Sequence, residues 1–408
     1  MNRALTVPAA IERRARWVLE TIGAHRLVYG DDLPYRPDAW EKVERGELPA
    51  GDEVAEAFFH LARVEESRGP RDAHGRFPAS ATALDLLDPP LERLRTRLGV
   101  EPPRWAGARF AVALTHDVDV PWRWSRGAVK GTAARIKRHA LSREGGETVR
   151  EARGLLTRPL HRLRGTDPNW SFERVLEIER SSGAGSTFFV MAGHRHPADG
   201  PSPETYARLR PKLVETLLRG GAEVGLHGSY TAAEDTGRLA EEKRVLEELA
   251  GPVVGQRYHY LRVDPARNLA PLEQAGFSYD SSLGFAGALG FRAGIAHPFR
   301  PWDLEADRPL DLIEIPLAAM DVTFDRRYLA LSARKAEPHF IALLEQAAAR
   351  GGGFAVLWHT DRFDRWTAAG WDRLYKRLIE RVGELGGVCM SAAELAEDAG
   401  RATSITTV

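Results

Sequence analysis

The chain has 408 residues, of which 43% are hydrophobic and 28% are charged, as is usual for globular proteins that bury a large core. Its 57 basic and 57 acidic side chains balance, which argues against a dedicated nucleic-acid-binding protein. The single cysteine, Cys389, excludes an internal disulfide framework, and no stretch approaches the ~18 apolar residues of a membrane span.

The first residues are charged and amphipathic, and they lack a continuous apolar run with a cleavage site. We therefore expect a cytoplasmic protein. Residues 1–107 carry weak strand signals and two helix-like runs, 11–23 and 51–66, and predict a smaller α+β accessory region.

From residue 108 to residue 408, short apolar runs alternate with amphipathic segments, which is typical of repeated βα units around a parallel sheet. We predict strands at 109–116, 185–193, 222–228, 253–262, 277–283, 312–321, 353–360 and, more weakly, 387–392. We predict helices between several of them at 204–221, 235–251, 333–352 and 370–387. Seven or eight strands favour a (β/α) barrel, and a doubly wound open sheet is the alternative. No glycine-rich phosphate-binding motif follows any strand.

A basic helical insertion, residues 122–165, interrupts this alternation. It contains twelve arginines and lysines, namely Arg123, Arg126, Lys130, Arg135, Lys137, Arg138, Arg143, Arg150, Arg153, Arg158, Arg162 and Arg164. Three acidic residues oppose them, namely Glu144, Glu147 and Glu151. One interpretation is a solvated surface excursion. The other is a lid over the barrel that contacts an anionic polymer or an anionic membrane.

Ionisable residues end three of the predicted strands. Strand side chains alternate between faces, so in residues 109–119 the large apolar side chains share one face and Asp117 and Asp119 share the other. His227 and His359 end two further strands. Each alone has an ordinary interpretation, a helix cap for an aspartate or hydrogen-bonded packing for a histidine. Together, two carboxylates and two imidazoles at one rim can bind a divalent metal and still leave a base and an acid.

The segment "THDVD" (115–119), with "STFFV" (186–190), "EVGLHGSY" (223–230), "YLRVDP" (260–265) and "VLWH" (356–359), resembles the motifs of the polysaccharide deacetylase superfamily, also called NodB homology or carbohydrate esterase 4. The resemblance implies a distorted (β/α) barrel that removes acetyl groups from N-acetylated sugars with a divalent metal. Zinc is the metal that we expect. The resemblance also implies roles for single residues: Asp117 as catalytic base, Asp119 and His227 as metal ligands, Arg262 as the residue that orients the base, and His359 as general acid.

Further phrases, such as "QRYHYLR" (256–262), "FSYDSSLGF" (277–285) and "EIPLAAMD" (314–321), resemble a bacterial subgroup with an N-terminal extension. One position departs from the superfamily pattern. The family usually has a second histidine four residues after the first, and this chain has Thr231 there. His259 is the predicted replacement ligand, with His116 and His297 as further candidates.

We therefore expect a metal-dependent hydrolase that removes an acetyl or similar acyl group from an N-acylated sugar or glycan. The alternative is a catalytically inactive glycan-binding or scaffolding barrel, for which Thr231 is the reason. The partner expected in either case is a glycan and not a nucleic acid, and the oligomeric state is not predicted.

Overall fold

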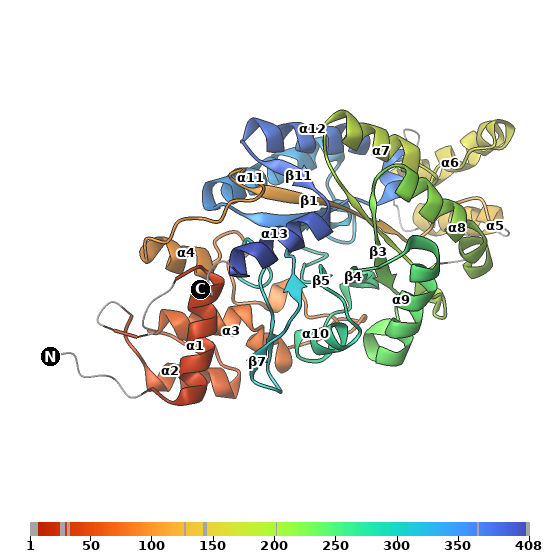
Figure 1. The fold of residues 1–408 in the computed structure, drawn as a ribbon. Helices are drawn as coiled ribbons and strands as arrows, with labels where there is room; N and C mark the ends of the chain where they lie inside the picture. Colours follow the sequence, from red (N-terminus) through yellow and green to blue (C-terminus); the bar gives the residue numbers. More distant parts are fainter. Residues whose placement is uncertain are drawn as a thin grey trace.

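The computed structural model describes residues 7–24, 29–30, 33–125, 128–141, 145–200, 202–364 and 367–404. A nine-stranded sheet in which all neighbouring strands are parallel forms its centre, in the order β8-β5-β4-β3-β2-β1-β10-β9, with β11 beside the first half of β1. The strands are β1 (Ala111–Val118), β2 (Thr187–Val190), β3 (Glu223–Gly228), β4 (Gly255–Tyr258), β5 (Tyr279–Asp280), β8 (Ile313–Glu314), β9 (Leu317–Met320), β10 (Gly353–Leu357) and β11 (Val388–Met390). The sheet curls into an incomplete barrel, because its two edge strands, β8 and β9, do not pair with each other (Figure 1). The predicted distorted (β/α) barrel is therefore confirmed.

Helices cover the outer face of this sheet. They are α7 (Phe172–Ser181), α8 (Pro203–Arg219), α9 (Thr236–Ala250), α10 (Pro265–Gln274), α11 (Ala333–Arg350) and α12 (Trp371–Glu384). The last helix, α13 (Ala392–Ser404), instead packs against the inner cluster of the barrel. The four helices predicted in this part of the chain correspond to α8, α9, α11 and α12. A separate antiparallel pair, β6 (Trp302–Asp303) and β7 (Arg308–Pro309), lies outside the main sheet.

The two faces of β1 have the composition that strand alternation predicts. Phe110, Val112 and Leu114 belong to the large hydrophobic cluster that includes the outer helices. Ala111 and Ala113 belong to a smaller cluster inside the barrel. Small inward residues leave space at the centre, and this is the face that continues to Asp117 and Asp119.

Two predicted strands are shorter than expected. The strand predicted over 253–262 ends at Tyr258, because Tyr260 and Leu261 have φ values of 60° and 52°, which no strand contains. The strand predicted over 312–321 is divided into β8 and β9 around Pro316, whose residue type lacks the N–H that a sheet ladder needs. Both breaks lie at the carboxyl ends of strands, where they re-aim the chain towards the site.

The N-terminal region contains α1 (Ala9–Thr21), α2 (Pro37–Arg45), α3 (Glu53–Leu61) and α4 (Pro90–Arg97) in its described residues, and its apolar side chains join the outer cluster of the barrel. A buried charge cluster also ties it to the barrel. Glu66 accepts hydrogen bonds from Arg63 Nε at 2.7 Å and from Arg292 Nε at 2.8 Å, and all three side chains are almost fully buried. The boundary at residue 107 stays a prediction.

The basic insertion is helical, as predicted, and forms α5 (Ala128–Leu141) and α6 (Gly145–Arg164), which pack together as a hairpin. Figure 1 shows this hairpin standing away from the sheet beyond α7 and α8. Arg126, Arg143 and Glu144 lie outside the described residues, as do the side chains of Arg135, Arg138, Glu147 and Arg150. In the part of the chain that the structure describes, no helix is both long and apolar enough to cross a membrane.

Candidate active site

The two aspartates that follow the apolar part of β1 have different neighbours. Asp117 is 5% exposed and accepts a hydrogen bond from Arg257 Nη1 at 3.0 Å. Asp119 lies one residue beyond the strand, with 35% of its side chain exposed, and three histidines surround it. The imidazoles hold the pKa of Asp119 well below its usual range despite the cost of burial, with His259 as the largest of their contributions. Asp119 is therefore ionised and able to bind a cation.

His227, near the end of β3, points its Nε2 atom at Asp119. Its Nδ1 lies 2.9 Å from the carbonyl oxygen of Arg257 and donates to it, so the neutral ring presents an unprotonated Nε2. That Nε2 lies 3.2 Å from Asp119 Oδ1 and 3.7 Å from Asp117 Oδ2. Both His227 Nε2 and Asp119 Oδ1 are buried without a hydrogen-bond partner. A metal ion bound between these two acceptor atoms would satisfy both of them.

His259 completes this group from the turn that follows β4. Its Nδ1 lies 3.3 Å from Asp199 Oδ1, and its Nε2 lies 3.5 Å from Asp119 Oδ1. One ligand atom from each of Asp119, His227 and His259 lies within 4.8 Å of the others, so this donor set fits a zinc-type metal ion. Thr231 precedes the short helix η4 (Ala232–Glu234) and is not a member of this group. The structure thus brings together the three residues expected to bind the metal.

His359 faces the group from the opposite side. Its Nε2 lies 3.7 Å from Asp119 Oδ2, and its Nδ1 donates to Asp321 Oδ1 at 2.7 Å. Asp321 Oδ2 in turn accepts from Arg362 Nε at 2.6 Å. Burial alone would lower the pKa of His359, but the adjacent Asp321 outweighs it and raises the pKa to about 10. The imidazole is therefore held in its protonated form, which suits a general acid. The sequence did not identify Asp321 or Arg362 as parts of this chain of contacts.

The arginine that contacts Asp117 is Arg257, and the expectation that Arg262 does so is not met. Arg257 has 0% exposure and also donates to Thr115 Oγ1 at 2.8 Å and to the Ser281 carbonyl oxygen at 2.7 Å, so its position is tightly held. Arg262 cannot reach Asp117, because β4 ends at Tyr258 and the chain turns away. Arg257 lies on the inward face of β4, and His259 follows it by two residues just after the strand ends, so strand alternation contained the signal that would have identified Arg257.

Arg262 instead connects the N-terminal region to the rim of the barrel. Its Nε donates to the His74 carbonyl oxygen at 2.8 Å, and it also hydrogen-bonds to the Tyr230 carbonyl oxygen and to Glu234. Arg76 Nη1 donates to the Tyr260 carbonyl oxygen at 3.1 Å. These contacts place the loop around His74 beside Asp117, Asp119 and His259.

A cavity of about 140 Å³ lies above these groups. His74 and Arg76 form part of its wall, together with Arg327 and Tyr328 and with Asp117, Asp119, His259 and His359 at its base. The N-terminal region, which the sequence marked as accessory, therefore shapes the space in which a substrate would bind.

His116 and His297, the further candidate ligands, lie elsewhere. His116 points to the outer face of β1, where its ring nitrogens lie 2.6 Å from the Trp358 carbonyl oxygen and 2.7 Å from Glu179 Oε1. His297 is buried with Nδ1 3.1 Å from the Pro298 carbonyl oxygen. Both have the packing role that a lone buried histidine usually has.

No protein-family model matches the chain, and no curated protein matches it. Solved structures similar to it include a candidate polysaccharide deacetylase from Mycobacterium smegmatis, with a TM-score of 0.48 and 21% identity, over 75% of this chain and 95% of that one. Puue allantoinase has a TM-score of 0.48 and 16% identity, over 78% of this chain and 97% of that one. Peptidoglycan deacetylase PdaC from Bacillus subtilis has a TM-score of 0.35 and 11% identity, over 73% and 95%. At these identities and TM-scores the comparisons do not assign a family, and the resemblance to polysaccharide deacetylases, like that to the subgroup, stays a prediction.

Proposed function

We propose that this protein is a metal-dependent hydrolase that removes an acetyl or similar acyl group from the nitrogen of an N-acylated sugar. The observation that carries the proposal is the division of contacts between the paired aspartates. Asp117 is bound to Arg257, whereas Asp119 lies among His227, His259 and His359. These contacts support Asp117 as the base and Asp119 as the metal ligand.

A divalent cation held by Asp119, His227 and His259 would supply Lewis acidity, polarising the carbonyl and making an attacking water more acidic. Asp117 would accept the proton of the water as the new C–O bond forms, with Arg257 orienting its carboxylate. His359, oriented by Asp321, would give its proton to the nitrogen as the C–N bond breaks. The immediate products are a carboxylic acid and a free amine, and the proton that Asp117 takes up balances the one that His359 gives. Zinc as the metal and a cytoplasmic location stay predictions.

The test compares Asp117→Asn with Asp119→Asn, using oligomers of N-acetylglucosamine as the probe and released acetate as the readout. We expect Asp117→Asn to lose at least ~10²-fold in kcat while its metal content stays near that of the wild type. Asp119→Asn should lose the metal as well. Equal loss of metal in both variants would contradict the assignment of roles.

The alternative, a glycan-binding barrel without catalysis, predicts a different result. Protein purified without a chelator would then contain no tightly bound zinc, nickel, cobalt or manganese, and it would bind the same oligomers without releasing acetate. Metal analysis of the wild type therefore separates the two functions before any variant is made.

A further inference from the structure

An apolar stripe runs along the exposed side of α6. Val149, Leu156 and Leu163 are spaced by seven residues, which places them on one face of the helix. They are 49%, 79% and 85% exposed, and Leu141 at the end of α5 is 76% exposed. We call these four side chains the α6 stripe. No other described large hydrophobic side chain is more exposed than 45%, so the most exposed large hydrophobic side chains of the described residues are gathered on this hairpin.

The opposite side of α6 is held to the body of the protein. Glu151 is buried and accepts a hydrogen bond from Arg123 Nη2 at 2.8 Å. The guanidinium of Arg158 lies 5.7 Å from the centre of the Trp124 ring. These contacts orient α6, so the stripe faces away from the core.

Cations flank the stripe. The exposed ones among the described residues are Lys130, Lys137, Arg153, Arg162 and Arg164. None of these five has an ion pair with a described carboxylate, whereas most other arginines on the surface do. An apolar stripe bordered by unpaired cations is the pattern of a helix that lies in the interface of an anionic bilayer.

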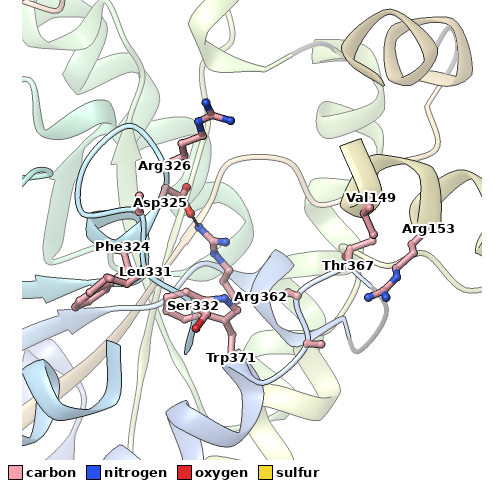
Figure 2. A pocket seen from close by; sticks show the side chains of 13 residues that line it. Val149, Arg153, Phe324, Asp325, Arg326, Leu331, Ser332, Arg362, Thr367 and Trp371 are labelled. Atoms are coloured by element: carbon pink, nitrogen blue, oxygen red, sulfur yellow. Dashed lines mark hydrogen bonds and ion pairs between the residues drawn. The ribbon is translucent and has the colours of Figure 1, made fainter. Parts of the chain in front are cut away.

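A pocket lined by Arg153, Arg326 and Arg362 and by one acidic residue, Asp325, opens next to the same helix, and we call it the basic pocket. It has a volume of about 490 Å³, and Figure 2 shows Val149 and Arg153 of α6 on one side and Arg362, Trp371 and Leu331 on the other. Val149 belongs to both the stripe and the pocket, so a lipid surface that covers one also faces the other. Arg362 also holds Asp321, which positions His359, so this pocket lies directly behind the proposed general acid.

We propose that the α5–α6 hairpin docks on an anionic phospholipid surface, with the α6 stripe inserted among the acyl chains and the basic pocket facing the headgroups. The combination of exposed leucines and cations distinguishes between possible partners. A nucleic acid or another soluble polyanion would use the cations but would gain nothing from the exposed leucines, whereas an anionic bilayer uses both. The proposal stands whether or not the barrel is a deacetylase.

The test is co-sedimentation of the full chain with vesicles of phosphatidylcholine alone and of equal parts phosphatidylcholine and phosphatidylglycerol. We expect the wild type to bind only the anionic vesicles, and less well at high salt because surface charges are screened. The triple variant Leu141→Ser, Leu156→Ser, Leu163→Ser should bind them at least about tenfold more weakly, since three apolar anchors are lost.

The matched control is Leu48→Ser, Leu87→Ser, Leu218→Ser, which removes three leucines that are 45%, 38% and 43% exposed elsewhere on the surface. It should bind as the wild type does. Circular dichroism and thermal unfolding show that each variant is folded.

Three outcomes would overturn the proposal. The wild type could fail to sediment with anionic vesicles. The stripe variant could bind vesicles and heparin as tightly as the wild type, which would make the partner a polyanion recognised by charge alone. Light scattering could show a wild-type dimer that the stripe variant converts to a monomer without any vesicle binding, in which case a second copy of the chain covers the stripe.

Discussion

His259 Nε2 lies 3.5 Å from Asp119 Oδ1, although the two residues are 140 positions apart and His259 is outside the usual spacing of the superfamily's metal motif. Asp199 holds the other ring nitrogen, so the imidazole is aimed at Asp119. We therefore predict that His259 supplies the metal donor that Thr231 does not.

The pair His259→Ala and Thr231→Ala tests this replacement. We expect His259→Ala to lower zinc affinity by at least ~10-fold, because one of three protein ligands is removed. Thr231→Ala should retain the wild-type metal content. Metal titration with a competing chelator gives both affinities. If Thr231→Ala lost metal affinity and His259→Ala did not, His259 would not be a ligand and the prediction would be wrong.

Arg257 and Arg262 are predicted to affect catalysis differently. Arg257→Lys keeps the positive charge but loses the planar set of donors that bridges Thr115, Asp117 and Ser281, so we expect kcat to fall by about 10- to 100-fold with metal content unchanged. Arg262→Gln should mainly raise KM, because Arg262 supports the wall of the cavity and does not touch Asp117. Steady-state kinetics with the N-acetylglucosamine probe checks the split. A larger fall in kcat for the Arg262 variant would contradict it.

Glu66 is predicted to make the stability of the protein depend on pH. Burial alone would raise its pKa, but Arg292 and Arg63 outweigh burial and lower the pKa to about 2. Since the carboxyl group of an unfolded chain titrates near ~4.5, the stabilisation is complete above that pH and is lost as the pH falls towards about 2. Its size is about 3 kcal/mol at neutral pH.

The measurement is the free energy of unfolding, from denaturant titrations at several pH values between neutrality and the acid limit at which the protein still folds. Glu66→Gln should be less stable at neutral pH and should lose less stability on acidification than the wild type. Glu12→Gln removes an exposed carboxylate from an i,i+4 pair with Arg16 and should leave the pH profile unchanged. A parallel profile for the Glu66 variant would show that the cluster does not stabilise the fold.

Gly255 in β4 is predicted to tolerate no side chain. A Cβ there would lie 1.9 Å from Cζ of Tyr279, whose buried hydroxyl donates to Glu223 Oε1 at 2.7 Å and so cannot easily move. We expect Gly255→Ala to lower the free energy of unfolding by at least ~1–3 kcal/mol through overpacking. Gly383→Ala in α12 is the matched control, since nothing lies within 4 Å of a Cβ at that position. It should be neutral or stabilising by up to ~1 kcal/mol.

Local patterns in the sequence were sufficient for the barrel and for much of its site. The alternation in residues 109–119 determined that Asp117 and Asp119 share the inward face, because successive strand residues point to opposite sides whatever the rest of the fold does. Strand ends carrying His227 and His359 indicated where the remaining groups would gather, since the carboxyl ends of parallel strands meet at one rim. The helical nature of the basic insertion also followed from its local composition.

Only the tertiary structure decided which of these groups touch. The turn at Tyr260 ends β4 early, and this places Arg257 rather than Arg262 against Asp117. Asp321 supports His359 from a different strand end, and the loop around His74 reaches the cavity from the N-terminal region. These contacts join positions far apart in the chain, and their distances depend on how strands end and how separate elements pack. Local periodicity carries no information about either, so the sequence indicated which ionisable groups gather at the rim but not the contacts that support them.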